Sequence, residues 1–187
     1  MVSTTAALRA TRDARKNFER EAVPHLDAVY SFAMRLTRHS EYARDLTQDT
    51  FVRAFERFDS FTRGTNCKAW LFSITYSIFV NQYHRGRRDP IRTDVDERHV
   101  LASMAGAQPL DSSARIAAEA DVEAALAQLT EDFRSVVLLV DVEELSYEEA
   151  AEVLGCPVGT IRSRLYRGRK LLGDHLRDYR AVGRERS

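Results

Sequence analysis

Apolar residues recur every three or four positions along most of the chain, which is the spacing that places them on one face of an α-helix. A first segment runs from Phe18 to Leu36, and Pro24 marks a boundary or a first turn within it. A second begins at Ser40, a fair N-cap, and ends near Phe58. The predicted inward positions are Leu26, Val29, Ala33 and Leu36 in the first, and Ala43, Leu46, Thr47, Thr50, Phe51, Ala54 and Phe58 in the second.

A third helix is predicted from Cys67 to about Arg85, with Asn66 as its cap. A helix that is apolar on two sides is either deeply buried or keeps aromatic side chains for a partner. Core packing is the more common role for each single ring, and Trp70 is expected to be structural. A basic run follows at residues 84–88 before Asp89-Pro90 stops the helix. The aromatic residues of this helix are Trp70, Phe72, Tyr76, Phe79 and Tyr83.

Residues 91–112 interrupt the helical pattern and show little periodicity. Gly106 and Pro109 break the segment, and its acids are Asp94, Asp96, Glu97 and Asp111. A polar segment of this kind buries too little apolar surface to fold by itself, so we predict a flexible acidic linker. The predicted organisation is a flexible N-terminal arm at 1–16, a helical domain at 17–90, the linker at 91–112 and a second helical domain at 113–187.

The helical pattern resumes near residue 113. One predicted face there consists of Val122, Ala125, Leu126 and Leu129. Thr130 is expected to cap a further helix, whose apolar stripe is Phe133, Val136, Val137 and Val140. The apolar run at 136–142 is explained better by a helix than by a strand. We therefore predict an all-α protein of two small helical domains.

Residues 146–170, SYEEAAEVLGCPVGTIRSRLYRGRK, have the pattern of a helix-turn-helix. Ser146 and Glu149 form a capping box, in which each side chain satisfies a backbone donor of the other residue. Gly155 suits the left-handed residue that ends a helix, and Pro157 suits the first turn of the next one.

The second helix of this unit carries two different faces. Its apolar stripe is Val158, Ile161, Leu165, Gly168 and Leu172. The opposite face mixes polar side chains that can reach base edges with cations that can hold phosphates, which favours binding in a DNA major groove over a merely solvated basic helix. The predicted contact residues are Gly159, Thr160, Arg162, Ser163, Arg164, Tyr166, Arg167 and Lys170, with Arg169 on the flank.

The net charge over 187 residues is zero, but the charges are unevenly distributed along the chain. Residues 131–155 hold eight acids against Arg134 alone, whereas residues 156–187 hold nine cations against three acids. The two cysteines, Cys67 and Cys156, form no CxxC or Cys/His cluster, so we expect inert thiols and neither metal nor cofactor. Since no signal core or membrane-length apolar run is found, the expected location is the cytoplasm, without membrane insertion.

Three motifs in order resemble an extracytoplasmic-function sigma factor of bacterial RNA polymerase. The segment at 43–58, ARDLTQDTFVRAFERF, resembles the region 2 helix that docks on the clamp helices of the largest polymerase subunit. GTNCKAWLFSI at 64–74, followed by NQYHRGRR at 81–88, resembles the part that melts and reads the −10 element. Residues 129–172 resemble region 4, which reads the −35 element.

The resemblance implies functional surfaces on these motifs. Aromatic rings that stack on bases, with arginines that track phosphates, suit single-stranded DNA. The acidic-polar positions at i, i+3 and i+4 from Asp45 suit a basic partner helix. The implied polymerase contacts are Asp45, Gln48, Asp49, Arg53 and Glu56. The implied −10 contacts are Asn66, Lys68, Tyr76, Ser77, Asn81, Tyr83, Arg85, Arg87 and Arg88.

The chain departs from the family pattern at two places. Ser77 stands seven residues after the tryptophan, where many members carry an asparagine that shapes the pocket for a flipped base. The −10 preference of the family therefore cannot be transferred. Near the start of the reading helix, Pro157 replaces the usual serine and follows Cys156, so capping there must come from the backbone or from the cysteine.

The family implies partners rather than catalysis. These are core RNA polymerase, through the clamp helices and the flap of the second-largest subunit, promoter DNA, and an anti-sigma factor that holds the free protein. The polymerase makes the bonds, so no enzyme activity is expected. A stand-alone dimeric helix-turn-helix regulator is the alternative, and it predicts palindromic half-sites bound without polymerase. An enzyme using Cys67 with His84 or His99 lacks a base, an orienting group and a nucleophile motif.

Overall fold

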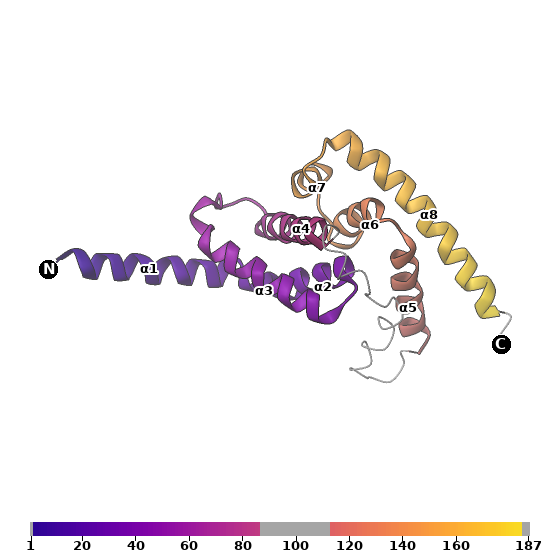
Figure 1. The fold of residues 1–187 in the computed structure, drawn as a ribbon, viewed down its shortest axis with the longest axis horizontal. Coiled ribbons are helices and arrows are strands. Elements are labelled where there is room, and N and C mark those ends of the chain that lie inside the picture. The colour runs from indigo at the N-terminus through magenta and orange to yellow at the C-terminus, as the bar shows by residue number, and fades with distance from the viewer. Residues whose placement is uncertain (1, 87–112, 185–187) are drawn as a thin grey trace. The chain divides into compact units, whose positions relative to one another are not determined.

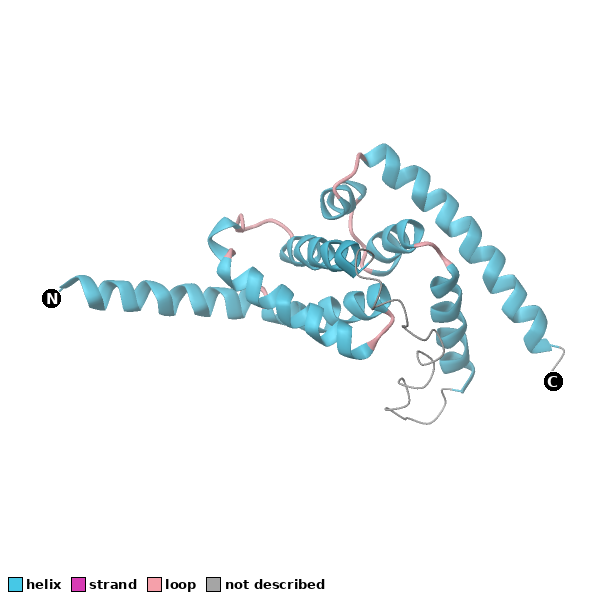
Figure 2. Ribbon diagram, viewed as in Figure 1, coloured by secondary structure: helices cyan, strands magenta, loops and turns pink. Residues whose placement is uncertain are grey.

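Helices account for all the regular structure in the described part of the chain. The computed structural model describes residues 2–86 and 113–184, and no strand occurs within these ranges (Figure 1 and Figure 2). The chain divides into two compact units, residues 1–95 and 96–187. The all-α prediction and the prediction of two helical domains are confirmed. The whole of the predicted linker, residues 91–112, lies outside the described residues.

Unit 1 is a bundle of three helices preceded by an N-terminal helix. Its elements are α1 (Val2–Glu21), η1 (Val23–His25), α2 (Leu26–Thr37), α3 (Ser40–Glu56), η2 (Phe58–Ser60) and α4 (Cys67–Gly86). Helices α2, α3 and α4 pack against one another (Figure 1). Phe32 and Phe72 meet at the centre with their ring centroids 4.7 Å apart, and Leu46, Leu71 and Ile78 complete a fully buried core.

The N-terminal segment, predicted to be a flexible arm at residues 1–16, is helical from Val2. The segment contains neither glycine nor proline and is rich in alanine and other good helix formers, and Nε of Arg15 lies 2.9 Å from Oε1 of Glu19 one turn later. At its other end, Phe18 is buried edge-on against the rings of Phe55 and Phe58. The residues of α1 favour a helix by themselves, and the burial of Phe18 anchors this helix to the rest of unit 1.

The junctions of α2 and α3 correct two further predictions. Ser40 is the first residue of α3 rather than its cap, because Arg38 is left-handed (φ 57°) and His39 is extended, which turns the chain within two residues. Leu26 is exposed rather than inward, since it opens α2 at the end of the bundle. Pro24 lies in η1 and so marks a boundary, as predicted.

The inward face of α3 agrees with the prediction, including its two threonines. Thr47 and Thr50 are buried, and each donates its hydroxyl hydrogen to the carbonyl four residues earlier, at 2.7 Å. The hydroxyl of Thr50 also lies 3.2 Å from that of Thr75 on α4. These contacts satisfy buried hydroxyl groups inside an otherwise apolar interface. Of the predicted inward positions, only Phe51 is half-buried.

Unit 2 places the helix-turn-helix on a support of two further helices. Its elements are α5 (Ser113–Gln128), α6 (Glu131–Val137), the π-helical turn η4 (Leu138–Val142), α7 (Tyr147–Leu154) and α8 (Val158–Arg184). Helix α8 packs against α5, α6 and α7. Thr130 occupies the cap position of α6 without a side-chain hydrogen bond to the backbone. Val122 is exposed, although it was predicted to face inward.

Gly168 allows α8 to approach α6 closely. A Cβ atom on Gly168 would lie 2.9 Å from Cγ2 of Val137 and 3.3 Å from the carbonyl oxygen of Phe133. Real Cβ atoms essentially never come within 3.0 Å of another heavy atom. The backbone contact at this position therefore requires glycine.

We predict that Gly168→Ala destabilises unit 2 by about 1–3 kcal/mol, the usual cost of overpacking a close contact. Gly173→Ala on the same helix is the matched control, because nothing lies within 4 Å of its added Cβ. The control should stabilise α8 by up to about 1 kcal/mol through helix propensity. Urea unfolding followed by circular dichroism measures both. Equal effects of the two substitutions would contradict the packing at Gly168.

Candidate nucleic-acid and polymerase surfaces

The turn between α7 and α8 is built by the predicted residues. The amide of Ser146 donates to Oε2 of Glu149 at 2.8 Å, and the amide of Glu149 donates to Oγ of Ser146 at 3.1 Å. Gly155 ends α7 in the left-handed conformation with φ 62°. Pro157 stands just before α8 rather than in its first turn, and its carbonyl accepts from the amides of Thr160 and Ile161. The capping box therefore starts α7, Gly155 ends it, and the carbonyl of Pro157 caps the start of α8.

The two faces of α8 are as the sequence predicted. Ile161, Leu165 and Gly168 are buried, and Val158 and Leu172 are half-buried. The opposite side is open, and 73% of Tyr166 is exposed. The exposed members of the predicted DNA surface are Gly159, Arg162, Ser163, Tyr166, Arg167 and Lys170, whereas Thr160 and Arg164 are half-buried.

Two arginines of α8 are bound to carboxylates of its own unit. Nη2 of Arg164 lies 3.0 Å from Oδ1 of Asp132 on α6. Nε of Arg169 donates to Oδ2 of Asp141 at 3.0 Å, and a second bond between the same groups makes the pair bidentate. The hydrogen bonds and charge of Asp141 raise the pKa of Arg169 above its ordinary value. These pairs hold α8 on its support and leave other cations for a partner.

Tyr147 adds a third link between α8 and the rest of unit 2. The guanidinium carbon of Arg162 lies 5.9 Å from the centroid of the Tyr147 ring, within cation–π range. Arg162 is nevertheless exposed and Tyr147 is the first residue of α7. The sequence pattern did not single out Tyr147 or the pairing of Arg169, because both depend on which helices come together.

The outward face of α3 in unit 1 combines acids with apolar side chains. All five residues of the predicted polymerase surface are exposed. Val52 and Phe55, which the sequence analysis did not single out, are 51% and 48% exposed on the same helix. Their spacing of three residues could have identified them, because neither belongs to the buried stripe. The five exposed predicted residues are Asp45, Gln48, Asp49, Arg53 and Glu56.

Predicted DNA-contact residues at the start of α4 make contacts within unit 1. Asn66 caps the helix, as predicted, because its Oδ1 accepts from the amide of Ala69 at 3.2 Å. Lys68 is half-buried, with Nζ 5.9 Å from the centroid of the Phe72 ring. Trp70 packs on Phe61 with the ring centroids 5.1 Å apart, which is the structural role expected of it.

Farther along α4, the predicted residues are more open. Tyr76 is half-buried beside Phe79, at 6.4 Å between ring centroids, and Ser77 and Asn81 are exposed. Tyr83 and Arg85 belong to the helix, but their side chains lie outside what the structure describes, as do residues Arg87 and Arg88 entirely. Among the described side chains of the predicted −10 surface, Asn66, Ser77 and Asn81 are therefore exposed, and Lys68 and Tyr76 are half-buried.

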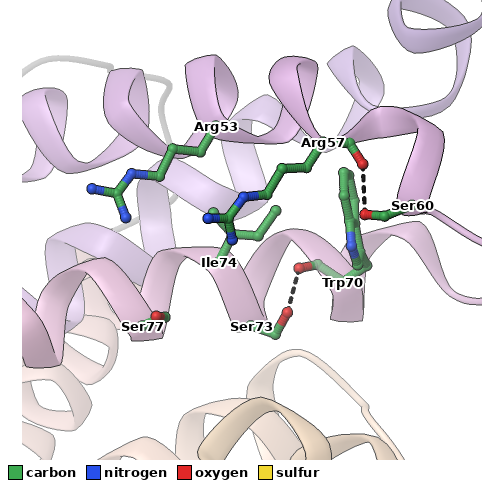
Figure 3. Close-up of a pocket in the computed structure, with 7 residues that line it drawn as sticks. All are labelled: Arg53, Arg57, Ser60, Trp70, Ser73, Ile74 and Ser77. Carbon is green, nitrogen blue, oxygen red and sulfur yellow. Dashed lines mark hydrogen bonds between the residues drawn. The ribbon is translucent and has the colours of Figure 1, made fainter.

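A hollow of about 270 Å³ lies between α3 and α4 (Figure 3). It brings together Arg53, predicted to contact polymerase, and Ser77, predicted to contact DNA. The sequence did not indicate this meeting, because the two residues come from different helices. The residues that line the hollow are Arg53, Arg57, Ser60, Trp70, Ser73, Ile74 and Ser77.

Comparisons with known proteins cover both units. The family described as Sigma-70 region 2 matches residues 23–89, and Sigma-70, region 4 matches residues 119–172. The ECF RNA polymerase sigma factor SigE of Mycolicibacterium smegmatis is 38% identical over 177 residues, which span 92% of this chain and 67% of that protein. The factor EcfG of Rhodopseudomonas palustris is 39% identical over 151 residues, which span 81% of this chain and 78% of that protein.

The chain belongs to the extracytoplasmic-function sigma factors.

A solved structure shares the fold of this sigma factor. It is the sigma factor RpoE in complex with the anti-sigma factor NepR from Bartonella quintana, with a TM-score of 0.71 and 34% identity. The match covers 87% of this chain and 98% of that one. In the described parts of this sigma factor, no helix combines the length and apolar character required to cross a membrane.

The two thiols of this sigma factor lie in different environments. Cys67, the first residue of α4, is buried, and burial together with the charge of Glu21 raises its pKa to about 11. Cys156 is half-buried in the turn before α8. Because the thiolate is the reactive form, only about one Cys67 side chain in a thousand is reactive at pH 8.

We predict that Ellman's reagent at pH 8 labels Cys156 quickly and Cys67 slowly in the folded protein. Cys156→Ser should remove the fast phase and leave the slow one, and Cys67→Ser should do the reverse. Both thiols should react quickly in denaturant. A fast phase that survives in Cys156→Ser would contradict the buried, protonated state of Cys67.

Proposed function

We propose that this sigma factor binds core RNA polymerase through α3 and reads the −10 and −35 promoter elements with α4 and α8. The observation that carries the proposal is the exposed polar and cationic face of α8, a helix that two ion pairs join to the rest of its unit. A helix that is held rigidly and open on one side suits major-groove recognition. The acidic and apolar face of α3 suits a separate protein partner.

The contacts of α8 divide into two kinds. Arg167 and Lys170 are exposed and take part in no ion pair among the described residues, so they are available for phosphates. Ser163 and Tyr166 lie beside them and supply groups that can reach base edges. Arg164 and Arg169 serve instead to position the helix, since their guanidinium groups already bind Asp132 and Asp141.

The α3 surface supports the proposed docking on polymerase. Asp45 and Asp49 lie one turn apart and are exposed, and Val52 follows on the same side. An apolar patch within charged surroundings is typical of protein interfaces, where buried apolar contacts give affinity and charges give orientation. The proposed partner surface is the clamp helices of the largest subunit, with the flap of the second-largest subunit contacting unit 2.

Control by an anti-sigma factor is part of the same proposal. The Bartonella relative, of similar length and fold, was solved with such a partner. An inhibitor that covers the exposed side chains of α3 would compete directly with polymerase. Affinity purification from the native cell should recover a small inhibitory protein, and recovery of polymerase without one would count against this part.

Reconstitution tests the whole function. The purified chain is combined with core RNA polymerase and a fragment library of the host genome, and run-off transcripts are sequenced. We expect a set of promoters with two shared elements at a constant spacing. Failure to associate with polymerase, together with binding to symmetric sites by the chain alone, would instead support a dimeric regulator.

We predict that Arg167→Ala and Lys170→Ala each weaken −35 binding and lower the slope of log K against log salt by about 0.9, because each removes one phosphate contact. Arg164→Ala is the matched control on the same helix. Its pairing with Asp132 should keep the salt slope within error of the wild type. Fluorescence anisotropy with duplex promoter DNA measures the slopes, and an unchanged slope in Arg167→Ala would show that this face is misassigned.

We predict that Asp49→Ala lowers the affinity for core polymerase about tenfold, the effect of losing about 1.4 kcal/mol at an interface. Asp59→Ala is the control, because Asp59 is also exposed but lies on η2 beyond the end of α3. Competition against a labelled wild-type chain gives both affinities. Equal losses in the two variants would mean that charge alone, rather than the α3 surface, governs docking.

A further inference from the structure

The hollow between α3 and α4 is positively charged on one wall. Figure 3 shows the side chains of Arg53, on α3, and Arg57, the residue that follows α3, reaching toward α4. Neither guanidinium forms an ion pair with a carboxylate in the described part of the chain. Two cations that share an open hollow without a counter-charge repel each other, and an anion placed between them relieves this repulsion.

Two of the serines that line the hollow, Ser60 and Ser73, donate their hydroxyl hydrogens to the backbone. Oγ of Ser60 donates its hydrogen to the carbonyl of Arg57 at 2.6 Å, and Oγ of Ser73 donates to the carbonyl of Trp70 at 2.7 Å. Each hydroxyl group carries one hydrogen, so both oxygens face the hollow as acceptors. Arg53 and Arg57 supply the cationic donors for an anion there, and the oxygens of Ser60 and Ser73 suit N–H donors on the same ligand.

A single strand of DNA combines the groups that this hollow accepts. It has phosphates for the arginines, exocyclic N–H groups for the serine oxygens and base faces for aromatic rings. Residues four apart on a helix have Cβ atoms about 5–6 Å apart, so Arg53 and Arg57 suit neighbouring phosphates on one strand. In a duplex the bases are paired and stacked, which hides their faces and their Watson–Crick edges.

The charge of α3 changes sign at one end of the hollow. Asp49 lies one turn before Arg53, and Nε2 of Gln82 on α4 is 3.4 Å from its Oδ2. A phosphate is repelled at Asp49 and attracted at Arg53. The border between the proposed polymerase surface and a DNA surface therefore falls between these two residues.

We propose that Arg53 and Arg57 bind consecutive phosphates of the opened promoter strand, so that the strand crosses α3 as well as α4. The inference rests on the proposed function and extends it. Arg53 moves from the polymerase surface, where the sequence placed it, to the DNA surface. Arg57, which the sequence did not indicate, joins it.

Trp70 provides a test that reports on this hollow alone, because it is the one tryptophan of the chain and lines the hollow. The full chain is titrated with a mixed-sequence single-stranded 12-mer at several salt concentrations, and tryptophan emission and oligonucleotide anisotropy are recorded together. We expect the bound strand to quench Trp70. Arg53→Ala and Arg57→Ala should each lower the salt slope by about 0.7, the value for one contact to a single strand.

Arg44→Ala is the matched control. Arg44 is an exposed arginine on α3, and its position nine residues before Arg53 places it on the opposite side of the helix. Its removal should change neither the quenching nor the slope. Binding without any change in Trp70 emission, or equal slopes in all three variants, would overturn the proposal. Equal quenching by the duplex of the same sequence, or by inorganic phosphate at the same phosphate concentration, would overturn it too.

Polymerase binding separates this inference from the proposed function. Arg53→Ala should bind core polymerase as the wild type does, and a loss comparable to that of Asp49→Ala would return Arg53 to the polymerase surface. A wild-type chain that binds the single strand at Trp70 but does not bind polymerase would overturn the proposed function alone. The roles of Arg53 and Arg57 in strand binding would then still stand.

Discussion

The backbone contact between Gly168 and α6 is the constraint on which the architecture of unit 2 depends. Helix α8 must bury one face in its own small core while it keeps the opposite face free for a partner. A glycine at the contact lets the two helices approach closely, so a narrow apolar stripe is enough to hold α8. The pairs of Arg164 and Arg169 with carboxylates then fix its rotation. The exposed side chains consequently share one rigid frame.

In unit 1, too, α3 is buried on one face and open on the other, and its buried face includes polar contacts. The interface of α3 and α4 contains the buried hydroxyls of Thr50 and Thr75, which lie 3.2 Å apart, and each is satisfied by the carbonyl four residues earlier on its own helix. This contact is one of those that set the register of the two helices. Register in turn decides that Arg53 and Ser77 face the same hollow. The packing of α3 against α4 in the core thus determines which side chains line the hollow at the surface.

The features that the sequence predicted are those governed by neighbours along the chain. The capping box of Ser146 and Glu149, the left-handed Gly155 and the buried stripe of α3 each depend on residues within a few positions, and the structure contains all of them. The outward positions of the predicted polymerase surface follow from the same periodicity. Whether those residues contact polymerase or DNA is a separate matter that helical spacing does not determine.

The features that the sequence did not predict depend on contacts between distant segments. The pair of Arg164 with Asp132 requires α6 and α8 to meet, and no local pattern distinguishes this arginine from Arg167. A helix from Val2 does not follow from the pattern of residues 1–16, and it is anchored by Phe18, which packs against residues of α3 and η2. The hollow between α3 and α4 likewise exists only after folding.

The separate hydrophobic cores of the two units have an evolutionary consequence. A substitution that loosens the contacts around Ile161 and Leu165 removes no atom from the cluster around Phe32 and Phe72. A substitution in one core therefore leaves the side-chain packing inside the other core unchanged. The surface of one unit can therefore change in sequence while selection conserves the other. In paralogous copies, the two units can diverge at different rates.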